Sequence, residues 1–132
     1  MKYLILILYF IPTMFICQEL TGSTNLDITK AWSQEPQGWT YQMNIFIPEE
    51  TSPENGFPIC ILLHGNGGVA AEFINEFSQH ISCHILIAPA GYMNSWNICS
   101  EESDAPDMEM LDELITSLSS YTNVNSSEIR LL

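Results

Sequence analysis

A histidine and a glycine-rich turn directly follow a short apolar run, and this arrangement could do chemistry through its backbone. The run at residues 59–63 (ICILL) is too short for a helix and is typical of a strand covered on both faces. It ends at His64, and the turn that follows consists of Gly65, Asn66, Gly67 and Gly68. Glycines after such a strand let the chain turn tightly and leave backbone N–H groups uncovered by side chains. An anion, or the oxyanion that develops during acyl transfer, can approach these N–H groups.

Two common phosphate-binding turns do not fit this stretch. The dinucleotide-binding fingerprint GxGxxG needs a third glycine, but Gly65 and Gly67 are followed by Ala70 at that position. A P-loop needs a lysine followed by serine or threonine, and the stretch has no lysine. Two interpretations remain: an oxyanion-binding turn, or glycines that serve only a tight strand-to-helix turn.

The elements around the turn have the pattern of a strand–helix–strand unit. After the glycines, apolar residues recur at spacings of three and four, which predicts a helix with the stripe Ala70, Phe73, Ile74 and Phe77. The run at residues 84–89 (HILIAP) predicts a second buried strand, and such a parallel pair is joined by a right-handed crossover. We therefore expect an α/β fold with a mostly parallel sheet and flanking helices.

Further elements are predicted on either side of this unit. An edge strand is expected near Ile28, and alternating apolar residues across residues 39–47 predict a half-buried strand that ends at Pro48. Asp107 favours the N-terminal end of a second helix. The apolar stripe of that helix consists of Leu111, Leu114, Ile115 and Leu118. Residues 127–132 begin another strand, which we expect to be buried at Ile129, Leu131 and Leu132; the alternative is a short edge strand.

The charge balance excludes several classes of partner. Three basic residues stand against sixteen acidic ones, and the formal net charge is −13. This negative field repels nucleic-acid phosphates and anionic lipid head groups, so neither nucleic acid nor a stable membrane partner is expected. The carboxylates are scattered, and no CxxC or Cys/His spacing indicates zinc. We therefore expect no metal site and no cofactor.

The first seventeen residues have the pattern of a secretory signal peptide. One lysine precedes an apolar run of about fourteen residues, which suits a signal h-region and is short for a bilayer span. Cleavage before Gln18 would leave residues 18–37 as an irregular lead-in and residues 38–132 as one domain. An acylated Cys17 is disfavoured by the bulky Phe15, and an uncleaved membrane anchor is a further alternative. The expected location is outside the cell.

Export would place three cysteines in an oxidising compartment: Cys60, Cys83 and Cys99. An odd number leaves one thiol without a partner inside this chain. Cys60 lies within an apolar run and Cys83 at the start of another, so both are expected to be buried free thiols. Cys99 lies in a polar loop and is the best candidate for a disulfide, whose pairing the sequence leaves open.

Five segments together resemble one family of enzymes. They occur in the order FPICILLHGNGG, ILIAPAG, SWNIC, DMEMLDELITSL and SSEIRLL. Their order and spacing are similar to those of secreted α/β-hydrolase esterases of the polyhydroxybutyrate depolymerase and feruloyl esterase type. The resemblance covers residues 38–132, and SWN with the cysteine that follows is its more specific part. It implies the N-terminal part of an α/β-hydrolase fold and serine-dependent hydrolysis of an ester of a small molecule, a polyester or a plant cell wall.

The resemblance also implies roles for individual residues. The backbone N–H of Asn66 would be one oxyanion donor of the enzyme. The binding residues that the resemblance implies are His64, Gly65, Gly67, Gly68 and Trp96. His64 would support the loop through hydrogen bonds and would not be the catalytic base. Trp96 matches an aromatic residue near the substrate cleft, although a tryptophan that packs in the core fits the motif equally well.

The nucleophile, the acid and the base of this family come later in the chain order. The GxSxG elbow would follow the strand at residues 127–132 and place the serine about five residues beyond Leu132. No serine of the chain lies in such a context. We therefore expect the N-terminal part of an ester hydrolase, inactive by itself. The alternatives are a non-catalytic hydrolase-like protein and a fragment of a peptidase or a dienelactone-type hydrolase.

We expect the mature protein to start near Gln18 and to be exported, because residues 1–17 have the length and apolarity of a signal sequence. N-terminal sequencing of protein recovered from the medium checks this. Recovery of a chain with an intact Met1 from the soluble cytoplasmic fraction would contradict it.

Overall fold

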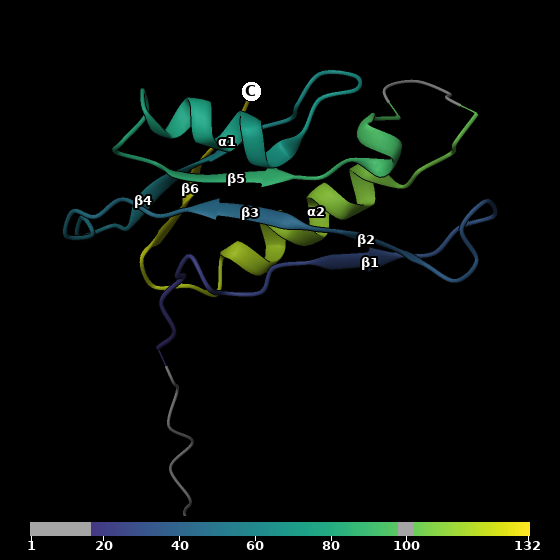
Figure 1. The fold of residues 1–132 in the computed structure, drawn as a ribbon. Helices are drawn as coiled ribbons and strands as arrows, with labels where there is room; N and C mark the ends of the chain where they lie inside the picture. The colour runs from purple at the N-terminus through teal and green to yellow at the C-terminus, as the bar shows by residue number, and fades with distance from the viewer. Residues whose placement is uncertain (1–16, 98–101) are drawn as a thin grey trace, which may run out of the picture.

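The centre of the fold is a four-stranded mixed sheet (Figure 1). The structure is a computed structural model that describes residues 17–97 and 102–132. In spatial order the strands are β3 (Met43–Phe46), β5 (Ile85–Pro89), β4 (Phe57–Ile61) and β6 (Val124–Leu131). β4 runs parallel to both β5 and β6, whereas β3 is antiparallel to β5. The helix α1 (Ala70–Ser78) connects β4 to β5, so the predicted strand–helix–strand unit is confirmed.

The predicted strand over residues 39–47 is in fact two strands. β2 (Trp39–Tyr41) pairs antiparallel with β1 (Ile28–Lys30), whereas β3 pairs with β5. The break falls at Gln42, whose carbonyl oxygen accepts a hydrogen bond from the Ala90 N–H at 2.9 Å. The prediction of one strand was wrong because the apolar alternation continues through the residue where the chain passes between the two sheets. The edge strand expected near Ile28 is confirmed.

The two α-helices cover opposite faces of the four-stranded sheet (Figure 1). α2 (Asp107–Leu118) packs on the face that carries Ile59, Ile61, Ile85 and Ile87. α1 packs on the face that carries Cys60, Leu62, Leu86 and Ala88. Because successive side chains of a strand point to opposite faces, β4 and β5 are apolar at every position, as their unbroken apolar runs predict. The chain is therefore a small α/β domain.

β6 lies at one edge of the described sheet, and its last residues are more exposed than the sequence predicts. Ile129 is partly buried, but Leu131 and Leu132 are 50% and 56% exposed. β6 pairs with β4 along one side, so its side chains meet fewer neighbours than those of a central strand. The expectation of a buried strand was therefore wrong, and the alternative of an edge strand fits the described sheet; an apolar composition does not distinguish the two.

The cysteines differ in exposure. Cys60 on β4 is a free thiol and is 2% exposed, as predicted. Cys83 is also free but exposed, contrary to the prediction. It lies in the loop between α1 and β5, before the buried part of the strand begins. The apolar run therefore predicts the burial of residues 85–89 but not that of Cys83, which precedes it.

Two predictions concern residues outside the described part of the chain. The signal-peptide segment falls almost entirely within residues 1–16, and Cys99 falls within residues 98–101. Across residues 17–97 and 102–132, no helix has the length and apolarity needed to cross a bilayer.

Candidate functional site

The glycine-rich turn lies at the carboxyl end of β4 and leads into α1. The Gly68 N–H donates a hydrogen bond to the Gly65 carbonyl oxygen at 2.9 Å, which closes the turn. The Gly67 N–H donates to the Asn94 carbonyl oxygen at 2.7 Å, which ties the turn to the loop after β5. Gly67 has a φ of 76°, and a Cβ on Gly68 would lie 2.9 Å from the Gly65 carbonyl oxygen. The path of the backbone therefore needs glycine at both positions.

His64 joins this turn to the carboxyl end of β5. Its side chain is buried, with 3% of the residue exposed. Nε2 accepts a hydrogen bond from the Gly91 N–H at 3.1 Å, so the proton of the ring is on Nδ1. Nδ1 donates that proton to the Gly65 carbonyl oxygen at 2.9 Å. Because both ring nitrogens are used in this way, His64 acts as a cross-link and has no nitrogen left for acid–base chemistry.

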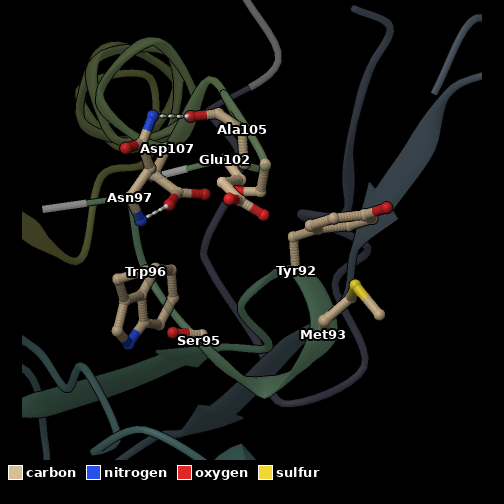
Figure 2. Close-up of a pocket in the computed structure, with 9 residues that line it drawn as sticks. Tyr92, Met93, Ser95, Trp96, Asn97, Glu102, Ala105 and Asp107 are labelled. Carbon is tan, nitrogen blue, oxygen red and sulfur yellow. Dashed lines mark hydrogen bonds between the residues drawn. The ribbon is translucent and has the colours of Figure 1, made fainter. Parts of the chain in front are cut away.

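Trp96 contacts both the turn and a neighbouring pocket. Its indole Nε1–H donates to the His64 carbonyl oxygen at 2.7 Å, and its ring centroid lies 5.0 Å from that of His64. Figure 2 shows the rest of the indole against the pocket, next to Ser95. The structure thus brings Trp96 and His64 together, although they are distant in the sequence.

The N–H of Asn66 is left without a partner by these contacts. No described residue accepts a hydrogen bond from it, whereas the N–H groups of Gly67 and Gly68 are both used. Asn66 is exposed. The Gly65 N–H likewise has no acceptor among the described residues. The turn therefore presents the Asn66 N–H, next to that of Gly65, as a free backbone donor at the carboxyl end of β4, where a developing negative charge could be stabilised.

A pocket of about 290 Å³ lies beside the turn (Figure 2). Its lining combines the apolar side chains of Tyr92, Met93 and Trp96 with the carboxylates of Glu102 and Asp107. The loop at residues 92–97 forms one wall of the pocket and also holds the turn through hydrogen bonds. The pocket and the free N–H are therefore connected through one loop.

The same loop contains two residues in the left-handed region, Met93 at a φ of 51° and Asn94 at a φ of 57°. Residues other than glycine adopt this conformation rarely, asparagine more readily than most. The bend brings the Asn94 carbonyl oxygen to the Gly67 N–H. Local strain of this kind is typical of binding and catalytic loops.

Asp107 is a site residue whose role the sequence did not reveal. It begins α2, as predicted from its preference for a helix N-terminus. Its carboxylate is buried, however, with 5% of the residue exposed. It accepts hydrogen bonds from the Tyr41 hydroxyl at 2.7 Å and from the Asn97 N–H at 2.6 Å. Only the tertiary fold brings these three residues together, so no local pattern could have predicted the contact.

Two tyrosine hydroxyls near the pocket have raised pKa values. Burial raises the pKa of Tyr41 far above its usual value, and the hydrogen bond to Asp107 and the charge of that carboxylate raise it further. The Tyr92 hydroxyl donates to Glu35 Oε1 at 2.8 Å, and this hydrogen bond is the main cause of the raised pKa of Tyr92. Both hydroxyls are therefore protonated donors at neutral pH.

A second polar cluster lies at the amino end of β5. The Cys83 Sγ and the His84 Nδ1 are 3.3 Å apart, and the Arg130 guanidinium on β6 donates to the His84 Nε2. Burial, and then the charge of Arg130, lower the pKa of His84. His64 and His84 lie at opposite ends of the parallel strands, so they do not form one site.

No family model matches this chain, and no curated protein or solved structure is significantly similar to it. The described part of the chain also contains no group of three or more His, Cys, Asp or Glu side chains that could hold a metal ion. The function therefore has to be inferred from the turn, the pocket and the strands that carry them.

We expect the stability of the protein to fall as the pH rises above about 10, the usual pKa of tyrosine. The folded state holds the Tyr41 proton to a higher pH than the unfolded state does, so this contribution is complete below that pH and is lost above it. Tyr41→Phe should reduce the alkaline loss. It should also cost about 1–3 kcal/mol at neutral pH, because the buried Asp107 loses a donor. Urea unfolding over this pH range measures both effects.

Tyr92→Phe is the matched control for this experiment, because it removes a hydroxyl whose carboxylate partner, Glu35, is not buried. The pKa of Tyr92 is raised mainly by its hydrogen bond to Glu35, whereas that of Tyr41 is raised mainly by burial. Tyr92→Phe should therefore remove a smaller share of the alkaline loss than Tyr41→Phe. An unchanged alkaline loss in Tyr41→Phe would contradict the prediction.

Proposed function

We propose that this chain is the N-terminal part of a secreted serine carboxylic ester hydrolase with an α/β-hydrolase fold, similar to polyhydroxybutyrate depolymerases and feruloyl esterases. In this proposal the Asn66 N–H is one of the oxyanion donors. The nucleophilic serine, the acid and the base are contributed by residues after Leu132. The substrate is an ester of a small molecule, a polyester or a plant cell wall.

The free N–H of Asn66 is the observation that carries the proposal. An oxyanion donor has to be exposed, unpaired and held in place before the reaction begins. Asn66 meets the first two requirements, because it is exposed and no described residue accepts a hydrogen bond from its N–H. The hydrogen bonds of His64 and Gly67 hold the donor in place, because they fix the backbone on both sides of Asn66.

The direction of β6 supports the same proposal. β6 is parallel to β4, so the carboxyl ends of the two strands meet at one edge of the sheet. The Leu132 N–H donates to the Ile61 carbonyl oxygen at 2.9 Å, and the Leu63 N–H donates to the Leu132 carbonyl oxygen at 2.7 Å. A residue that follows Leu132 would therefore emerge beside His64. A serine in an elbow after β6 would lie close to the Asn66 turn.

The chemistry of ester hydrolysis gives each of these parts a task. The serine oxygen attacks the ester carbonyl carbon while a histidine base takes its proton, and the carbonyl oxygen becomes a tetrahedral oxyanion. The Asn66 N–H would donate a hydrogen bond to that oxygen. Collapse of the intermediate releases the alcohol, which takes the proton, and water then hydrolyses the acyl-enzyme. His64 would keep the donor in position throughout, because its own ring nitrogens are occupied.

The pocket offers a place for part of the substrate. Binding sites for small molecules are concave and mostly apolar, with a few polar groups that set the orientation. Tyr92, Met93 and Trp96 supply the apolar lining here. Trp96 also holds the His64 carbonyl oxygen, so a substrate against its indole would lie near the oxyanion donor.

The coding sequence after Leu132 tests the proposal. We expect it to continue in frame with a GxSxG motif whose serine lies about five residues on. We expect the extended protein to hydrolyse p-nitrophenyl acetate or methyl ferulate, whereas the chain of 132 residues should not exceed the background rate. A stop codon, or a continuation without the motif, would overturn the proposal.

Two substitutions in the extended protein separate the backbone of Asn66 from its side chain. Asn66→Pro removes the N–H and should reduce kcat by about a hundred- to a thousandfold. Asn66→Ala keeps the N–H and should reduce kcat far less. Circular dichroism has to show that both variants are folded, because proline also strains the turn. Equally large losses in two folded variants would assign the effect to the side chain and contradict the proposal.

A further inference from the structure

The pocket beside the turn carries negative charge from two carboxylates. Asp107 is buried, and its hydrogen bonds come from neutral donors, the Tyr41 hydroxyl and the Asn97 N–H. Glu102 also lines the pocket, and no described residue pairs with its carboxylate. A buried charge is normally balanced by a charge of opposite sign or by several hydrogen bonds. Among the residues that the structure describes, no lysine or arginine balances the charge of this pocket.

The basic residues that the structure describes are engaged elsewhere. Lys30 pairs with Glu113 on α2, and Arg130 pairs with Glu128 on β6. Neither of them lines the pocket. With a formal net charge of −13, the protein as a whole adds to the negative potential at this site.

The remaining lining is aromatic and sulfur-containing. Figure 2 shows the Glu102 carboxylate directed between the ring of Tyr92 and the indole of Trp96, with Met93 next to Tyr92. Aromatic faces attract alkylammonium groups, and tryptophan does so most strongly. The combination of a carboxylate with aromatic rings is therefore suited to an organic cation.

The segment that carries Glu102 is fixed to the rest of the fold. The Trp32 indole donates to the Ser103 carbonyl oxygen at 2.7 Å, and the Gln34 side chain donates to the Glu102 carbonyl oxygen at 3.0 Å. Trp32 also packs edge-on against Tyr92, with ring centroids 4.9 Å apart. Glu102 and Tyr92 are thereby held on the same side of the pocket by the loop between β1 and β2.

We propose that this pocket binds a small organic ammonium group, of the alkylammonium or quaternary ammonium class. Its volume of about 290 Å³ is at the lower end for ligand pockets, which fits a compact head group. A hard metal cation such as Ca²⁺ needs about six to eight oxygen ligands, and the aromatic and thioether lining does not provide them. The proposal concerns binding alone and does not depend on the proposed ester hydrolysis.

Choline and its uncharged analogue 3,3-dimethylbutan-1-ol provide a matched pair of probes, because they have nearly the same shape and differ in charge. The ¹H–¹⁵N NMR spectrum of the full chain reports binding through the Trp96 indole N–H and the backbone N–H groups of residues 92–97. We expect choline to shift these signals in a saturable way and to bind about tenfold more tightly than the alcohol. Added salt should weaken the binding of choline but not that of the alcohol.

Glu102→Gln removes the unpaired charge and keeps the size of the side chain. It should reduce the preference for choline over the alcohol severalfold, and the remaining preference comes from Asp107 and the aromatic rings. Glu72→Gln, at an exposed position on α1, removes the same charge away from the pocket and should leave the preference unchanged. Both positions are exposed, and a dispersed spectrum shows that each variant is folded.

The preference for the cation decides the proposal. Equal affinities for choline and the alcohol, a choline preference that is undiminished in Glu102→Gln, or equal losses in the Glu102 and Glu72 variants would overturn it. Signals outside residues 92–97 that shift while those inside do not would also overturn it, because the cation would then bind elsewhere.

Discussion

The two hydrogen bonds of the His64 ring hold the carboxyl ends of β4 and β5 in a single arrangement. A buried imidazole can satisfy the Gly65 carbonyl oxygen and the Gly91 N–H together in one tautomer only. Trp96 and Asn94 then fasten the loop after β5 to the turn. Once these bonds are made, the N–H groups of Gly67 and Gly68 are used, whereas that of Asn66 has no acceptor among the described residues. The proposed oxyanion site therefore depends on a histidine that does not itself react.

A second buried group organises the other side of the loop. The carboxylate of Asp107 links Tyr41 on β2 to Asn97, so it joins the two-stranded sheet, α2 and the loop after β5. His64 holds one end of the loop at residues 92–97 and Asp107 holds the other. The pocket lies between them, and its shape is therefore set by two buried polar residues.

The sequence was sufficient to predict the elements that depend on local periodicity. The unbroken runs at residues 59–63 and 84–89, and the helical spacing between them, predicted β4, α1 and β5. It was insufficient where long-range contacts decide: the alternation through Gln42 concealed a change of sheet, and the apolar end of β6 did not reveal an edge strand. The glycine turn was recognisable from its motif. The contacts of Asp107 were not, because its partners are far away in the sequence.

Amide hydrogen exchange of the turn tests the central claim most directly, because it reads each N–H separately. The account predicts that the Asn66 amide exchanges at nearly the rate of an unstructured peptide. The amides of Gly67 and Gly91 should be protected by the Asn94 carbonyl oxygen and the His64 Nε2. Protection of Asn66 equal to that of Gly67, or exchange of Gly91 as fast as that of Asn66, would contradict it.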